Sequence, residues 1–186
     1  TVASILAIAV LGLNLQWGNT GLFNGGVVAF FGAGAYGTLI LGGGPQDGQL
    51  GGFSLFYPLA LLGGMATAGL LAWGVGILTL RLRHDYLAIS TFGIAVAFEN
   101  LMRNAQWLGG GAQGLRGFER PLRAALGDGF LYNILFLLCV LVLLVVTYRF
   151  LETLVASPFG RQLRAIREDE TAARSLGKSP ARIRLT

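Results

Sequence analysis

GFLYNILFLLCVLVLLVVTY, residues 129–148, is the stretch that decides the fold, because none of its side chains carries a charge. About 20 apolar residues in a helix cross the hydrocarbon core of a bilayer, so a run of this length is typical of a membrane span. Residues 1–46 and 48–80 also lack charged side chains. A soluble protein of 186 residues could bury one such helix but hardly four. The sequence therefore predicts an integral membrane protein.

Composition supports the same class. Charged residues are 12% of the chain, against about 25% in soluble domains. We expect an all-α polytopic membrane protein in which about five helices form a bundle. The predicted segments are Val2–Gln16, Gly21–Leu41, Phe53–Leu80, Tyr86–Met102 and Gly129–Phe150.

Further predictions concern the two ends of the chain and the interruption between the first two apolar segments. Residues 1–150 are predicted to form a transmembrane region, and residues 151–186 a cytoplasmic segment. The missing initiator Met and the ending ARIRLT indicate a piece of a longer protein. Val2–Leu15 has no basic region before it, so we expect a span and not a signal peptide. Residues 17–21 (WGNTG) are either a short loop or an unwound point in a broken helix.

Orientation follows from the basic residues. The segment 151–186 holds seven of the fourteen Lys and Arg residues, and RLRHD (81–85) holds two more. An even number of predicted crossings separates the two segments, so the positive-inside rule places both in the cytoplasm. The loop 103–128 then lies outside, although it carries four arginines, which is against the rule.

A glycine motif raises the question of a nucleotide. Gly32, Gly34 and Gly37 match G-x-G-x-x-G, which binds dinucleotides only between a strand and a helix, with an acidic residue about 20 positions later. Here the neighbours are apolar and the nearest acid is Asp47. We therefore expect no cofactor at these glycines.

Small residues at a spacing of four explain the glycines better. Such a spacing gives a helix one smooth face, and two smooth faces let helix backbones approach closely in lipid. We predict that two helices pack this way. The residues are Gly21, Gly25, Ala29, Ala33 and Gly37 on the earlier segment, and Ala60, Gly64, Ala68, Ala72 and Gly76 on the later one.

Polar residues inside the spans are candidates for a transport path, namely Asn24, Glu99 and Asn100. Glu99 lies 13 residues after Tyr86, or about 20 Å along a helix. A carboxylate at such depth normally faces protein or water. It either lines a path or pairs with Arg103 at i+4 near the interface.

The chain shows no catalytic arrangement. It has one His, and we find no P-loop, H-E-x-x-H or nucleophile elbow. His84 lies among charged residues and is predicted to be a solvated loop residue. Cys139 is the only cysteine, so neither a disulfide nor a metal site is expected. We expect no enzyme activity, catalytic residue or nucleic-acid partner, and any ATP hydrolysis must come from another subunit.

The segment after the last apolar run predicts a short amphipathic helix. Ser157 is a suitable N-cap, with Pro158 at the first helical position. Phe159, Leu163 and Ile166 then form an apolar stripe at helical spacing. Arginines flank it, so we expect the stripe to anchor a partner, with the charges at the rim.

A second short helix is predicted directly afterwards. Asp169 is its cap, Glu170–Leu176 its body, and Gly177 its end. Two short helices at an angle form a knob for a groove in a partner. The alternative is a basic amphipathic segment on anionic lipid, and the periodicity leaves both open.

Longer motifs carry a family resemblance. SPFGRQLRAIREDETAARSLG (157–177) resembles the cytoplasmic coupling loop, or EAA-type motif, of ABC importer permeases. LGLNLQWGNTGLFNGGVVAFFGAGAY (11–36), RLRHDYLAISTFG (81–93) and WLGGGAQGL (107–115) resemble, in the same order, regions of branched-chain amino acid permeases of the LivM type. Two places depart from the pattern: Thr171 stands where an acidic residue is usual, and residues 24–26 (NGG) replace a common Gly-His pair.

The resemblance implies which residues dock on an ATPase. They lie in the coupling loop and are Phe159, Gly160, Arg161, Leu163, Arg164, Ile166, Arg167, Glu168, Asp169, Glu170, Ala172, Ala173 and Gly177.

The resemblance also implies a function and its partners. The chain would be a multi-pass permease subunit of a bacterial or archaeal inner membrane, carrying branched-chain or other neutral amino acids by alternating access. Its partners would be a second permease, two cytoplasmic ABC ATPase subunits, an external binding protein and the lipid membrane. Two alternatives stay open: a permease for urea or short amides, and a membrane scaffold or assembly protein that transports nothing.

Overall fold

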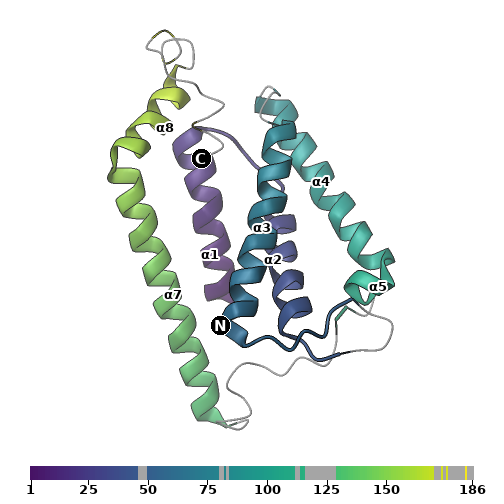
Figure 1. The fold of residues 1–186 in the computed structure, drawn as a ribbon. Helices are drawn as coiled ribbons and strands as arrows, with labels where there is room; N and C mark the ends of the chain where they lie inside the picture. The colour runs from purple at the N-terminus through teal and green to yellow at the C-terminus, as the bar shows by residue number, and fades with distance from the viewer. Residues whose placement is uncertain are drawn as a thin grey trace. The chain divides into compact units, whose positions relative to one another are not determined.

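The computed structural model describes residues 1–45, 50–79, 82, 84–111, 114–115, 129–169, 173, 175 and 183. Among these residues all regular structure is helical, which confirms the predicted all-α class (Figure 1). The chain divides into two compact units, which are described separately. The first comprises Thr1–Asn24, Ile77–Ala88 and Asp128–Thr186, and the second comprises Gly25–Gly76 and Ile89–Gly127.

The first unit is built on two apolar helices, α1 (Val2–Asn14) and α7 (Phe130–Ala156), which contact each other. α1 continues into a π-helical segment, η1 (Leu15–Thr20), so this apolar helix has 19 residues in all. α8 (Pro158–Glu168) follows α7 after Ser157 and turns away from its axis (Figure 1). It contacts both α7 and η1.

The end of η1 resolves the uncertain stretch 17–21. The helix continues through it to Thr20 and ends at Gly21, whose φ of 72° is the left-handed conformation that favours glycine after a helix. Residues 21–24 have no regular structure, and the next helix begins at Val27. The predicted helical face is therefore wrong at Gly21 and Gly25, because both precede that helix.

The second unit holds α2 (Val27–Gly42), α5 (Gln106–Gly109) and most of α3 (Tyr57–Thr79) and α4 (His84–Asn104). His84 is the first residue of α4, so its predicted place in a loop is wrong. The glycines of the G-x-G-x-x-G motif all lie inside α2 and not in a turn before it.

α2 and α3 approach each other through small residues. A Cβ added at Gly34 would lie 3.4 Å from the Ala68 Cβ, and one added at Gly42 would lie 3.0 Å from the Ala60 Cβ. A Cβ at Gly64 would overlap atoms of α2, among them the Gly34 carbonyl oxygen. Because these partners occur in opposite order along the two helices, α2 and α3 run antiparallel.

Apart from Gly21 and Gly25, all the small residues of the two predicted faces lie on these two helices. Ala29, Ala33 and Gly37 lie on α2, and Ala60, Gly64, Ala68, Ala72 and Gly76 lie on α3. Ala29 and Ala60 are among the most buried of the described residues, with 3% and 0% of their surface exposed.

α4 packs along α2 in the same direction. The Gly25 amide donates to Thr91 Oγ1 over 3.0 Å, and Thr91 is buried. A Cβ at Gly25 would lie 3.1 Å from the Phe92 Cβ, and one at Gly32 would lie 3.2 Å from the Phe98 ring. Thr91 was not among the polar residues that the sequence singled out, although its hydroxyl binds the backbone just before α2 begins.

Three helices in the described residues are long and apolar enough to cross a membrane: Val2–Thr20, Tyr57–Thr79 and Phe130–Ala156. They coincide with three of the five predicted spans. α2, with 16 residues, and α4, with 21, coincide with the other two, whose crossing stays a prediction. Large side chains of α7 are exposed, for example Phe130 at 82% and Val146 at 61%. Such a helix surface requires apolar surroundings.

Candidate functional site

A tight junction with the end of α7 positions α8. The Ser157 amide donates to the carbonyl oxygens of Thr153 (3.0 Å) and Leu154 (3.2 Å). Ser157 is the N-cap residue of α8 and Pro158 its first residue, which confirms the predicted helix start. The Ser157 hydroxyl does not cap α8, however, because it donates to the Leu154 carbonyl over 2.6 Å. Its bond therefore closes α7.

The junction depends on a glycine. A Cβ added at Gly160 would overlap the backbone carbonyl of Val155, so a larger residue would push the first turn of α8 away from the last turn of α7. Arg164 Nη2 donates to the same carbonyl over 3.3 Å. Carbonyls in the last turn of a helix lack intrahelical partners, so a cation is favourable there. These contacts set the direction in which α8 leaves α7.

The two sides of α8 differ in exposure. Gly160, Leu163 and Ile166 are buried, with only 4% and 3% of the two larger residues exposed, and Phe159 is half-buried. The predicted apolar stripe thus exists, but the chain itself covers its central residues. The expectation that this stripe anchors a partner is wrong for this reason. The exposed side carries the polar residues Arg161, Arg164, Arg167, Glu168 and Asp169.

Arg167 connects α8 to the end of the first apolar helix. Its Nη1 donates to the carbonyl oxygen of Gly18 in η1. A Cβ added at Gly21 would lie 3.1 Å from the Arg167 Cγ, so the stem of the arginine passes over this glycine. The partners are 149 positions apart in the sequence. No local sequence pattern predicts that the Gly18 carbonyl accepts a hydrogen bond from this arginine or that Gly21 packs against its stem.

Beyond α8 the structure describes little of the segment that resembles a coupling loop. The Asp169 carbonyl accepts a hydrogen bond from the Ala173 amide over 3.1 Å, and Ala173 is buried. This bond lies where the second short helix was predicted to start. Glu170, Thr171, Ala172 and Gly177 lie outside the described residues, as does most of that predicted helix.

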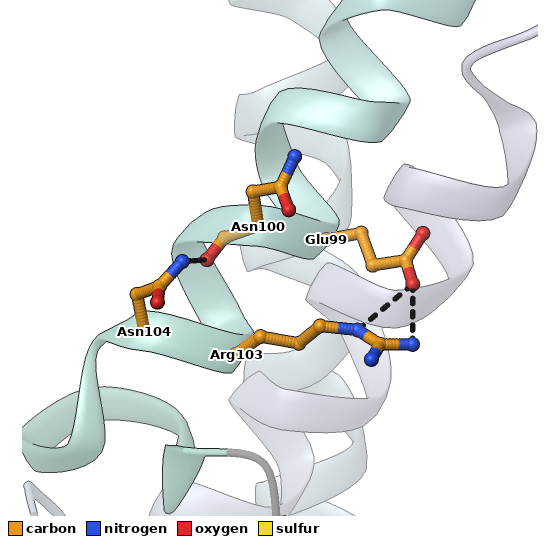
Figure 2. Close-up of polar contacts among 4 residues, drawn as sticks. All are labelled: Glu99, Asn100, Arg103 and Asn104. Carbon is orange, nitrogen blue, oxygen red and sulfur yellow. Dashed lines mark hydrogen bonds and ion pairs between the residues drawn. The ribbon is translucent and has the colours of Figure 1, made fainter.

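The contacts described for the polar candidates of α4 lie within their own helix (Figure 2). Arg103 donates to Glu99 Oε1 from Nε (3.0 Å) and Nη2 (2.8 Å), which confirms the predicted i+4 pair. Both side chains are about two-thirds exposed, at 60% for Glu99 and 66% for Arg103. Asn104 Nδ2 donates to the Asn100 carbonyl over 2.8 Å, and Figure 2 shows the Asn100 side chain pointing away from the ion pair. A role in a transport path stays a prediction.

The candidates for a transport path belong to different units. Asn24 is half-buried and belongs to the first unit, whereas Glu99 and Asn100 belong to the second. In the part of the chain that the structure describes, no group of three His, Cys, Asp or Glu residues could hold a metal ion. Cys139 is exposed on α7.

Comparison with known proteins gives one consistent family. The family model for the permease component of branched-chain amino acid transport systems matches residues 1–186. The high-affinity branched-chain amino acid transport system permease protein LivM of Escherichia coli K12 is 35% identical to the whole chain, and that of Salmonella typhimurium LT2 is 37% identical. The chain covers 47% of each, so it spans about half the length of these relatives.

A more distant relative comes from an archaeon. A probable branched-chain amino acid transport permease protein LivM of Methanocaldococcus jannaschii is 31% identical over 56% of this chain and 30% of its own length. No solved structure matches the chain.

Proposed function

Because the chain belongs to the permease family of branched-chain amino acid transport systems, we propose that it forms the membrane part of an ATP-driven importer. Its cargo is branched-chain or other neutral amino acids. It crosses the inner membrane several times and moves its substrate by alternating access. ATP is bound and hydrolysed by partner subunits and not by this chain.

The observation that carries the proposal is the placement of α8. This amphipathic helix follows a 27-residue apolar helix after one residue, and it buries Leu163 and Ile166 against its own chain. Its other side exposes charged residues, which suit a cytoplasmic partner. We infer that the exposed side of α8 receives an ABC ATPase.

The proposed partners are those that an importer of this kind requires. A second permease completes the transport path, two ATPase subunits sit on the cytoplasmic side, and an external binding protein delivers the amino acid. When the ATPases close on ATP, they push on α8, and the tight junction at Gly160 passes the movement to α7. Substrate shifts such an equilibrium only through different affinity for the outward-open and inward-open states.

The test is transport by the reconstituted complex. The full-length permease, its partner permease, both ATPases and the binding protein are placed in proteoliposomes with internal ATP. We expect ATP-dependent uptake of labelled leucine and stimulation of ATP hydrolysis by the leucine-loaded binding protein. Unlabelled leucine or valine competes, and urea does not.

Two results would contradict the proposal in different ways. Uptake of labelled urea or acetamide by the same proteoliposomes, with no uptake of labelled leucine, would identify a short-amide permease. An assembled complex without uptake or substrate-stimulated hydrolysis would support a scaffold. A complex lacking the binding protein is the control, because it holds the same membrane chains without a substrate supply.

A further inference from the structure

α8 is held to the apolar helices at two separate places. The first is the junction with α7, where Gly160 and Arg164 both meet the Val155 carbonyl. The second is Arg167, near the other end of α8, which reaches the Gly18 carbonyl in η1. Two attachments near opposite ends of an 11-residue helix hold its direction as well as its position.

The second attachment involves both parts of the Arg167 side chain. The guanidinium donates to Gly18, and the aliphatic stem lies over Gly21. The positive φ of Gly21 already favours glycine, and a Cβ there would also crowd the stem. A neutral side chain that replaces only the aliphatic stem, such as that of Met, keeps the stem contact but has no donor for the carbonyl, so the two contributions can be separated.

Two features of η1 make such a partner favourable. π-helical turns are rare and occur frequently at functional sites. Gly18 also lies in the last turn of the helix, where carbonyls lack intrahelical partners and a cation is favourable. Arg167 therefore acts as a C-terminal cap for the first apolar helix, supplied from 149 positions away.

We propose that Arg167 is a positioning residue that ties α8 to η1, the end of the first apolar helix. A displacement of α8 is then passed to α1 through η1, as well as to α7 through the junction at Gly160. Without this tie, α8 moves with α7 alone, and ATP hydrolysis is no longer coupled to movement of α1. The proposal rests on the proposed function for the displacement, but the tie itself can be tested without transport.

The experiment uses the full-length permease in its reconstituted complex. Arg167→Ala and Arg167→Met remove the donor, and Arg167→Lys keeps a charged donor. Hydrogen exchange reports the tie, because the Gly21 amide donates to the Trp17 carbonyl over 3.1 Å and is exposed to solvent when η1 opens. We expect exchange at Gly21 to rise about tenfold in both neutral variants. Lysine should restore part of the protection.

Transport per ATP hydrolysed is the functional measurement. In the neutral variants we expect it to fall about tenfold, which is typical of a lost coupling between two sites. Recovery of the ATPases with the permease is measured on the same preparations, because Arg167 also belongs to the exposed side of α8. Arg149→Ala on α7 is the matched control, because Arg149 is exposed and its one described ion pair is with Glu152, within its own helix.

Each contrary outcome has a distinct meaning. Loss of the ATPases from the complex would make Arg167 a docking residue and overturn the inference. Equal deprotection of the Asp169 amide, which donates to Ala165 over 3.1 Å, would mean that Arg167 only supports the fold of α8. If exchange at the Gly21 amide is the same in the neutral variants as in the wild type, the tie is refuted, whether or not the wild-type complex transports. Failure of the wild-type complex to transport would instead count against the proposed function.

Discussion

Arg103 and Arg167 form their contacts in opposite ways. Arg103, near the end of α4, pairs with Glu99 one turn away on the same exposed helix surface. Arg167, near the end of α8, reaches a carbonyl 149 positions distant and joins two helices. The first contact can be predicted from the sequence spacing, and it joins only two residues of the same helix. The second is invisible in the sequence and holds two elements together, so we expect it to matter more.

Burial on α8 gives the sharpest way to test this difference, and the largest effect. Leu163→Asp places a carboxylate at a position that is only 4% exposed, and an unpaired buried charge costs several kcal/mol, about 3–5. We expect α8 to detach from α7 and η1, with residues 157–169 cleaved rapidly in limited proteolysis and the ATPases lost. Leu163→Met, which conserves volume, is the control. If the ATPases are lost while α8 stays protected, Leu163 contacts the partner and not its own chain.

The α2–α3 contact extends the comparison to uncharged residues, with a smaller effect. Gly64→Ala would place a methyl group against Thr38 and the Gly34 carbonyl, and overpacking of this kind costs about 1–3 kcal/mol. Gly69→Ala, five residues later on α3, meets nothing within 4 Å and is the matched control. Thermal unfolding of the purified permease should separate the two variants, with only Gly64→Ala lowering the midpoint. Equal midpoints would show that α2 and α3 have room between them.

The exposed side of α8 is predicted to be sensitive to salt. Arg161→Glu reverses a charge that faces away from the chain, and such charges mainly change the rate and salt dependence of association. We expect ATPase affinity to fall about tenfold at low ionic strength and less at 1 M salt, where the Debye length is about 3 Å. Pull-down over a salt series measures this, with Arg149→Glu on α7 as control. Weaker binding to anionic vesicles with unchanged ATPase recovery would instead place this side on lipid.

The Glu99–Arg103 pair should give the smallest effect. Glu99→Gln removes an ion pair between side chains that are more than half exposed, and such pairs contribute about 0–1 kcal/mol. We expect unfolding and leucine uptake to stay nearly unchanged, as they should in Glu152→Gln, which removes the exposed i,i+3 pair of α7. A fall in uptake at normal expression, found for Glu99→Gln alone, would show that Glu99 lines the path after all.

The sequence by itself determined the long apolar helices and the membrane class, because both depend on local properties. A charge-free run such as residues 129–148 must form its backbone hydrogen bonds internally if it crosses a bilayer, and a helix does this whatever packs beside it. The start of α8 at Ser157 and Pro158, the amphipathic spacing of Leu163 and Ile166, and the i+4 pair at Arg103 depend on neighbours within two turns. Each of these was predicted.

Only the tertiary structure decided what the two sides of α8 face. Spacing shows that Leu163 and Ile166 share a side, but whether chain or partner covers that side depends on where α7 and η1 lie. The Arg167–Gly18 bond likewise requires two segments at the opposite ends of the sequence to meet. Hydrogen bonds and burial between distant segments exist only once both segments are packed, so no local pattern in either segment can specify them.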